Sequence, residues 1–308
     1  MGTRRRNHPK IIVVLGPTAS GKSNLAVKIA KKFKGEIVSA DSRQVYRGMD
    51  IGTGKVENES TKKDVFIHQG IIHHCIDIAS PKRRFSVAQY QKAAQKSIND
   101  ILKREKLPIL CGGTAFYIKA LVEGISLPEA LPDWSLRKEL NKKNKQELYS
   151  MLRNLDPERA KNIEKDNPRR LIRALEIVIQ TDKPVPEIKK NYQYNPLFIG
   201  TKIDREKLNK RIEKRLDERL KQGMIDEVDK LRGSGLSWQR IKSFGLEYKW
   251  LAKYLQKEIS YQEMHESLLR DIIKFSKNQM AWWKNDPGIE WIDKNQDALS
   301  LVKNFIKK

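Results

Sequence analysis

Apolar residues near the start of the chain occur in two short runs, the first of which is unbroken. Residues 10–15 and 36–40 are rich in β-branched side chains, a pattern typical of parallel strands buried on both faces. Between the runs, Leu25 and Ile29 recur at helical spacing in a stretch that ends at about Phe33. Because a helix that joins two parallel strands lies on one face of their sheet, the pattern predicts a βαβ unit.

A second alternation of helix and strand follows. Ser86 and Gln89 form a capping-box pattern, and the apolar residues after them share one helical face. Residues 108–111 read as a strand that runs into the glycine turn of residues 112–117, before another helix. We therefore expect the first 120 residues to form a doubly wound α/β layer.

The pattern changes at about residue 123. Strand signals are absent from 123–194, where helical periodicity dominates, and they return at 197–203. Further helices are predicted at 205–222, 224–232, 245–256 and 261–284. The predicted fold is an α/β parallel sheet with a phosphate loop and flanking helices, formed by 1–122 and 195–308, with 123–194 as an inserted all-helical domain.

The composition indicates a polyanionic partner and disfavours several classes of protein. The 308 residues include 62 Lys and Arg but only 38 Asp and Glu, a formal net charge of +24 that predicts a polyanionic partner such as nucleic acid. The apolar run near the start is far too short to span a bilayer, so no membrane association is expected. Cys75 and Cys111 stand alone in their segments, which favours a reducing cytoplasm over a disulfide framework or a zinc cluster.

Residues 16–23 match the phosphate-loop pattern G-x-x-x-x-G-K-[ST] throughout. The match follows a predicted strand and opens a predicted helix, as the mechanism requires. Lys22 supplies a cation for the terminal phosphate, and the Ser23 hydroxyl can hold Mg²⁺. The loop predicts a phosphate or diphosphate ligand without specifying ATP. The candidate diphosphate-binding residues are Gly16, Pro17, Thr18, Ala19, Ser20, Gly21, Lys22 and Ser23.

Asp41 lies at the predicted carboxyl end of the second strand. Ligands of open parallel sheets bind beyond these strand ends, so Asp41 is expected to face the ligand of the loop. Its position fits a general base and a turn cap equally well. The strand at 109–111 ends in Gly112 and Gly113 without a carboxylate to order a metal, which disfavours a motor or GTPase.

Basic residues follow one face of three predicted helices. Each stripe alone is typical of a solvated helix face, but three stripes together favour a track for a phosphate backbone. The stripes are Arg169, Arg170 and Arg173; Arg211, Arg215 and Arg219; and Arg270, Lys274, Lys277 and Lys284 beside Trp282 and Trp283.

Several motifs, in order along residues 10–292, resemble the bacterial tRNA dimethylallyltransferases. They are the loop at 16–23, Asp-Ser-Arg-Gln-Val-Tyr at 41–46, Gly-Met-Asp-Ile-Gly-Thr at 48–53, His-His-Cys-Ile-Asp at 73–77, Gly-Gly-Thr-Ala-Phe-Tyr at 112–117 and Asn-Pro-Arg-Arg-Leu-Ile-Arg-Ala-Leu-Glu at 167–176. The resemblance implies transfer of a dimethylallyl group from its diphosphate to N6 of the adenosine just 3′ of the anticodon, in tRNAs that read codons beginning with U.

The resemblance also implies residue roles. Asp41 would act as the base, with Thr18, Lys22, Arg215 and Thr114 as further catalytic residues, Mg²⁺ on Ser23, and a monomeric enzyme with no obligate protein partner. The implied tRNA contacts are Asp41, Ser42, Arg43, Gln44, Thr114, Arg137, Arg169, Arg170, Leu171, Ile172, Arg173, Lys242, Ser243, Phe244, Gly245, Leu246, Glu247, Lys277, Asn278, Gln279, Trp282 and Lys284.

This chain departs from the family pattern at a few positions. Residues 277–282 read Lys-Asn-Gln-Met-Ala-Trp where many members have Lys-Arg-Gln-x-Thr-Trp, Leu246 replaces a common Tyr, and Gly54 replaces a common Ala. Two other functions fit parts of the sequence. The loop alone fits a small-molecule or nucleotide kinase, and the charge alone fits a non-catalytic RNA-binding factor.

Overall fold

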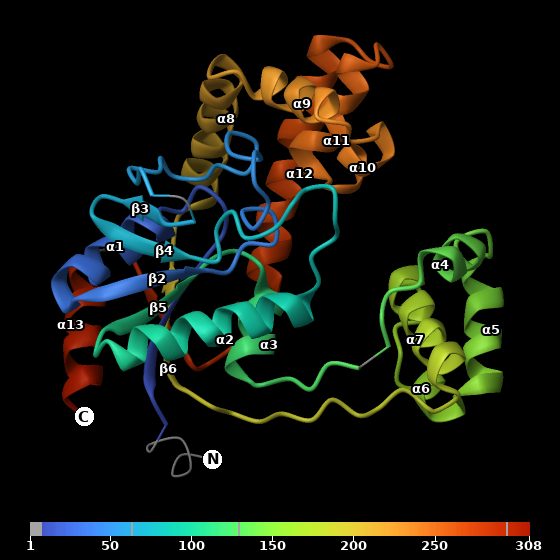
Figure 1. Ribbon diagram of the computed structural model, residues 1–308, viewed down its shortest axis with the longest axis horizontal. Helices are drawn as coiled ribbons and strands as arrows, with labels where there is room; N and C mark the ends of the chain where they lie inside the picture. The colour runs from blue at the N-terminus through green and yellow to red at the C-terminus, as the bar shows by residue number, and fades with distance from the viewer. Residues whose placement is uncertain (1–7, 63, 129, 294) are drawn as a thin grey trace. The chain divides into compact units, whose positions relative to one another are not determined.

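The computed structural model describes residues 8–308 except 63, 129 and 294 (Figure 1). The chain divides into two compact units. One comprises the residues up to Gly124 and those from Tyr192 onward, and the other comprises Ile125–Asn191. No helix in these described ranges combines the length and the apolar composition that crossing a membrane requires.

The larger unit is built on a seven-stranded sheet with the order β3-β4-β2-β5-β1-β6-β7. All neighbouring strands are parallel except the β3–β4 hairpin, which confirms the predicted parallel sheet. The sequence pattern missed β3, β4 and β7, because strands of three or four residues are too short to show a period. The strands are β1 Lys10–Leu15, β2 Gly35–Ser39, β3 Phe66–His68, β4 Ile71–His74, β5 Leu107–Cys111, β6 Asn195–Thr201 and β7 Ile289–Ile292.

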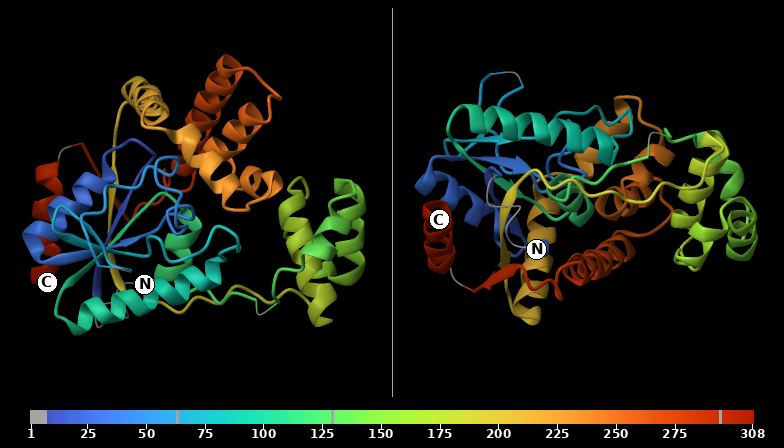
Figure 2. Two further views of the ribbon diagram at one scale, coloured as in Figure 1. Left: turned by 45° about the horizontal axis from the view of Figure 1, so that its top comes forward. Right: turned by 90° about the horizontal axis from the view of Figure 1, so that it is seen from below.

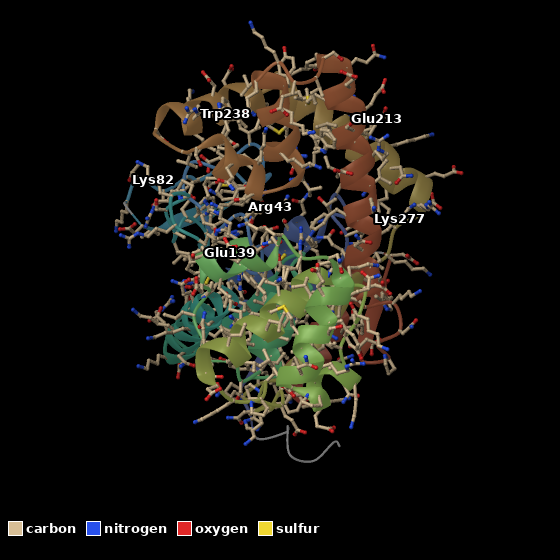
Figure 3. The ribbon with its side chains drawn as sticks, turned by 90° about the vertical axis from the view of Figure 1, so that its right-hand side faces the viewer. Arg43, Lys82, Glu139, Glu213, Trp238 and Lys277 are labelled. Atoms are coloured by element: carbon tan, nitrogen blue, oxygen red, sulfur yellow. The ribbon has the colours of Figure 1, made fainter. Side chains whose placement is uncertain are left out.

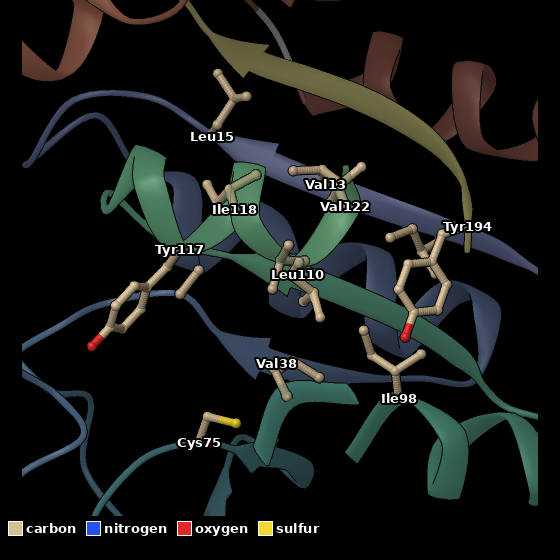
Figure 4. Packing of buried hydrophobic residues seen from close by; sticks show 14 of the residues in the cluster. Val13, Leu15, Val38, Cys75, Ile98, Leu110, Tyr117, Ile118, Val122 and Tyr194 are labelled. Atoms are coloured by element: carbon tan, nitrogen blue, oxygen red, sulfur yellow. The ribbon is translucent and has the colours of Figure 1, made fainter. Parts of the chain in front are cut away.

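Helices cover both faces of the sheet. Figures 1 and 2 show α1 (Lys22–Phe33) and α13 (Asn295–Lys307) on one face, and α2 (Val87–Lys103) and α3 (Ala115–Val122) on the other. Alternate residues of β1 serve both layers, since Ile12 and Val14 pack in the core of α1 whereas Ile11, Val13 and Leu15 pack in the core of α2 and α3 (Figure 4). The unbroken apolar run in the sequence follows from this double burial.

The remaining helices of the larger unit form a third core. Leu208, Ile212 and Leu216 of α8 are buried there, together with Val45 and Met49 from the segment after β2. This core therefore fixes the segment that follows Asp41 against α8. The helices are α8 Arg205–Lys221, α9 Met224–Gly233, α10 Trp238–Ser243, α11 Leu246–Leu255 and α12 Tyr261–Ala281. The sequence pattern missed the six-residue α10 and also α13.

The smaller unit is helical and has a core of its own. Its helices are α4 Trp134–Leu140, α5 Lys145–Leu155, α6 Pro157–Lys161 and α7 Pro168–Thr181. Prolines at the first positions of α6 and α7 fit helix starts, where the missing N–H costs nothing. The predicted boundary at residue 194 is displaced, because Tyr194 is buried in the sheet core of the larger unit (Figure 4).

Glu36 anchors the amino end of β2, away from the glycine turns. Its buried carboxylate accepts hydrogen bonds from Arg104, Lys106 and His74. Burial raises the pKa of Glu36, but these hydrogen bonds outweigh burial and lower the pKa from 4.5 to about 2. A carboxylate with a depressed folded-state pKa stabilises the fold above the unfolded pKa, and that stability is lost as the pH falls through the folded pKa.

We expect Glu36→Gln to lower the free energy of unfolding by about 2–3 kcal/mol at neutral pH, because it removes the charge on which three donor side chains converge. The difference between the wild type and the variant should narrow as the pH falls from 4.5 toward 2, the interval over which wild-type Glu36 is protonated. Urea denaturation at neutral pH and at about pH 3 measures both values. A difference that does not change with pH would contradict this assignment.

Candidate active site

The phosphate loop connects β1 to α1, and the structure explains why two of its positions require glycine. A Cβ on Gly16 would lie 2.1 Å from Thr201 Oγ1, so the loop passes too close to β6 for any side chain. Gly21 has a left-handed φ of +89° at the N-cap of α1, a conformation that favours glycine. The backbone therefore turns sharply into the helix, whose first N–H groups are available to an anion.

Side chains from distant segments hold the loop in place. Ser20 Oγ lies 2.7 Å from Thr201 Oγ1 in a hydrogen bond. The Thr18 N–H donates to Gln279 Oε1 of α12 at 2.8 Å, and Gln279 Nε2 donates to the carbonyl of Gly113 at 3.0 Å. Gln279 thus ties the phosphate loop to the second glycine turn. This buried amide serves the backbone, which differs from the tRNA contact predicted for it.

Lys22, the first residue of α1, is the cation of the phosphate loop. Its Nζ donates to the Pro17 carbonyl at 3.1 Å, and its side chain lines the same cavity as Thr18 and Asp41. Burial lowers the pKa of the Lys22 ammonium, while the nearby Asp41 raises it. A bound anion would favour the charged form of Lys22 further, so the site is suited to a phosphate group.

Asp41 caps a turn and also lines the cavity, so its position is compatible with both of its predicted roles. Its Oδ1 accepts hydrogen bonds from the N–H groups of Arg43 at 2.9 Å and Gln44 at 3.3 Å, so it caps a turn. The same carboxylate lines the cavity, and Oδ2 has no hydrogen-bond partner among the described residues. Beside it, Thr114 Oγ1 accepts from the Ser42 N–H at 3.0 Å.

The cavity has a volume of about 260 Å³ and gathers many of the predicted site residues. Those that line it are Thr18, Lys22, Asp41, Ser42, Arg43, Thr114, Arg215, Leu246, Glu247, Asn278, Gln279 and Trp282. The segments that supply them are separated by up to 264 positions, and the carboxyl ends of β1, β2 and β5 bring the first of them to one rim.

Guanidinium groups form one wall of the cavity. Arg215 Nη2 donates to the Gly54 carbonyl at 3.1 Å, and Arg219 Nη1 donates to the Gly52 carbonyl at 2.9 Å. Glu247 accepts from both Arg219 at 3.2 Å and Arg43 at 3.3 Å. Arg219 was predicted as part of a basic stripe with Arg215, one helical turn before it, but not as a residue that lines this cavity.

Apolar side chains line another part of the cavity. Ile272 and Phe275 lie on α12, and Phe116 lies in the first turn of α3 with an exposed ring. None of the three was predicted as a site residue, because an apolar residue at helical spacing reads as core in a sequence. Together they give the cavity an apolar portion beside its cationic one.

Several residues of the predicted tRNA surface have other partners in the structure. Phe244 is buried, with ring contacts to Tyr46 at 5.1 Å and to Tyr248 at 5.7 Å, so its side chain belongs to the core. Glu247 is buried in its two ion pairs, and Lys242 pairs with Glu258 at 2.6 Å. By contrast, Ser243, Lys277, Asn278, Trp282 and Lys284 have exposed side chains, and Lys277 is labelled on α12 in Figure 3.

The helical unit shows the same division. Leu171 and Ile172 are buried in its core, so their side chains hold α7 rather than face a ligand. Arg137 and Arg173 both donate to the buried carboxylate of Glu176. Arg169 and Arg170 remain exposed on α7, with Arg170 paired to the exposed Glu164 at 3.2 Å. The exposed charge of the predicted stripe is thus limited to its first two arginines.

A metal ion has few protein ligands in this site. The described residues contain no group of three His, Cys, Asp or Glu side chains able to hold a metal. Ser23, the second residue of α1, has an exposed side chain beside the loop. A hydroxyl oxygen suits Mg²⁺, which keeps most of its coordination for substrate phosphates and water. The residues present therefore fit a metal that arrives with a phosphate ligand.

Comparisons with known proteins agree on one family. The family model described as IPP transferase matches residues 44–286. The chain is 40% identical over 306 residues to the tRNA dimethylallyltransferase of Acetivibrio thermocellus, covering 96% of each chain. It also resembles the crystal structure of the full-length tRNA isopentenylpyrophosphate transferase of Bacillus halodurans, with 35% identity, a TM-score of 0.70, and coverage of 97% of this chain and 95% of that one.

A more distant likeness extends to the fold alone. A eukaryotic dimethylallyltransferase solved while acting on tRNA matches with a TM-score of 0.79 at 24% identity, over 97% of this chain and 80% of that one. The family model and the bacterial relatives favour a transferase over the kinase alternative. With the family model over most of its length and relatives at 40% identity along nearly all of it, this chain belongs to the IPP transferase family.

Proposed function

We propose that this protein transfers a dimethylallyl group from dimethylallyl diphosphate to N6 of the adenosine just 3′ of the anticodon, in tRNAs that read codons beginning with U. The observation that carries the proposal is a single cavity lined by both the phosphate-loop residues Thr18 and Lys22 and the carboxylate of Asp41. An anion cradle and a base that line one space suit a transfer with a diphosphate leaving group.

In the proposed reaction, the bond between the prenyl C1 and the diphosphate oxygen breaks, and a bond between C1 and N6 forms. The leaving diphosphate would lie on the loop N–H groups, Lys22 and Arg215, whose positive charge stabilises the charge that develops on its oxygens. Asp41 would accept the N6 proton through Oδ2. Ile272 and Phe275 supply apolar surface for the prenyl group.

Mg²⁺ is part of the same proposal. Ser23 would hold it beside the phosphate loop, together with oxygens of the diphosphate. When bound, the ion adds positive charge at the leaving group. The protein's own contribution is the loop that orients the diphosphate and the Lys22 ammonium next to it.

The tRNA is proposed to bind through exposed basic and aromatic side chains. Lys277, Trp282 and Lys284 near the end of α12, and Arg169 and Arg170 on α7, are exposed and would contact phosphates or unpaired bases. The net charge of +24 supports a polyanionic substrate of this kind. We further propose a cytoplasmic monomer, a location that suits the free, buried thiols of Cys75 and Cys111.

We expect Asp41→Asn to lower the rate of prenyl transfer by about 10²–10⁴-fold, the range of general-base catalysis. The amide oxygen can still cap the turn at Arg43 and Gln44, so the fold and the tRNA affinity should be retained while the base is lost. Transfer of labelled dimethylallyl diphosphate to unmodified tRNA measures the rate. Asp229→Asn, on an exposed face of α9, is the matched control. Normal turnover by Asp41→Asn would refute the assignment of Asp41 as the general base.

We expect Arg169→Ala to weaken tRNA binding and to reduce the slope of log affinity against log salt by about 1, because one phosphate contact is lost. Filter binding over a range of salt concentrations measures the slope. Arg153→Ala, an exposed arginine of α5 in the same unit, provides the comparison. Equal slopes for the wild type and Arg169→Ala would remove α7 from the proposed tRNA surface.

A further inference from the structure

We propose that Glu227 is a positioning residue for the diphosphate site, acting through the loop of residues 50–54 on Arg215 and Arg219. The inference rests on the proposed function and adds to it a residue that lines no part of the cavity. Glu227 lies on α9, and its side chain is nine-tenths buried.

The carboxylate of Glu227 holds one side of this loop. Its Oε2 accepts from the N–H groups of Asp50 at 2.7 Å and Ile51 at 2.6 Å, and its Oε1 accepts from the Gly52 N–H at 3.0 Å. Tyr248 Oη donates to Oε1 as well, at 2.8 Å. Three consecutive backbone donors and one hydroxyl thus converge on one ionised group, an arrangement that strengthens each hydrogen bond.

The other side of the loop holds the guanidinium wall. The carbonyls of Gly52 and Gly54 accept from Arg219 at 2.9 Å and Arg215 at 3.1 Å. Glu227 therefore orients a peptide segment whose N–H groups face α9 and whose carbonyls face the cations of α8. The loop of residues 50–54 thus connects the Glu227 carboxylate to the Arg215 and Arg219 side chains in the cavity.

Packing around Gly52 leaves little freedom for this arrangement. A Cβ there would lie 2.7 Å from the Tyr248 ring and 3.1 Å from Glu227 Oε1. Burial raises the pKa of Tyr248, as does the adjacent Glu227 carboxylate, so the phenol keeps its proton and remains a donor. The segment is confined between Tyr248, Glu227 and the two arginines.

Confinement matters because arginine side chains are long and flexible. An unanchored guanidinium loses rotamer entropy when it binds an anion, whereas one already held in place loses less. Fixing the carbonyls of Gly52 and Gly54 would thus increase the affinity of Arg215 and Arg219 for diphosphate. Glu227 would influence the ligand in this way without touching it.

The test compares two buried carboxylates of the same unit. In Glu227→Gln, the amide NH₂ would oppose at least one backbone N–H in either orientation, so we expect inorganic diphosphate to bind about 10-fold more weakly by calorimetry. The KM for dimethylallyl diphosphate should rise similarly, while the Kd for tRNA changes by less than about 3-fold because its contacts are spread over many phosphates. Glu36→Gln, which removes a buried carboxylate far from the loop, should lower stability without changing diphosphate affinity.

The inference would be overturned if Glu227→Gln bound diphosphate as tightly as the wild type. Glu227 would then have a purely structural role. If Glu227→Gln does not fold, Tyr248→Phe serves as the test variant. It lacks one hydrogen bond to Glu227, so we expect its diphosphate affinity to fall about 3-fold. Unchanged diphosphate affinity in Tyr248→Phe would overturn the inference. Wild-type protein that does not bind diphosphate at all would contradict the proposed function itself, and this inference with it.

Discussion

Opposite charges that line one small cavity are the constraint on which the site depends. The phosphate loop and Lys22 provide positive potential in this cavity, and Asp41 provides a negative charge near enough to raise the pKa of Lys22. The two must be close enough to act on one substrate but separate enough not to neutralise each other. The turn cap holds Asp41 in place, because Oδ1 accepts from the N–H groups of Arg43 and Gln44, while Oδ2 has no hydrogen-bond partner among the described residues.

The sheet order explains why these groups meet. Strands β2, β5, β1 and β6 are parallel neighbours, so their carboxyl ends lie side by side on one rim. Asp41, the second glycine turn and the phosphate loop follow the ends of β2, β5 and β1, and Thr201 is the last residue of β6. Gln279 then reaches from α12 to bond with both glycine turns, so the C-terminal helices complete a site that begins at the N-terminal strands.

Much of this arrangement could be predicted from local sequence. The apolar run of β1, the glycine spacing of residues 16–23 and the position of Asp41 after β2 are determined by neighbours along the chain, and the structure has each where it was expected. The capping box at Ser86 is confirmed in full. Residue type and period suffice for such features because the physics that produces them is local.

Other parts depended on contacts that no local pattern contains. Arg173 is indistinguishable from Arg169 in the sequence, yet a buried Glu176 binds only the former of these two. Phe244 and Leu171 lie within segments for which the family resemblance implied tRNA contacts, but each side chain is buried in a hydrophobic core. The contacts of Glu227 could not be predicted, since three of its four donors are backbone groups some 175 positions away.

The most direct measurement is a crystal structure with a thio analogue of dimethylallyl diphosphate that resists transfer. The account predicts diphosphate oxygens within about 3 Å of the loop N–H groups and of Lys22 Nζ, with the prenyl carbon C1 on the side of the cavity that contains Asp41 Oδ2. Diphosphate bound away from the loop, or a prenyl group that points away from Asp41, would contradict it.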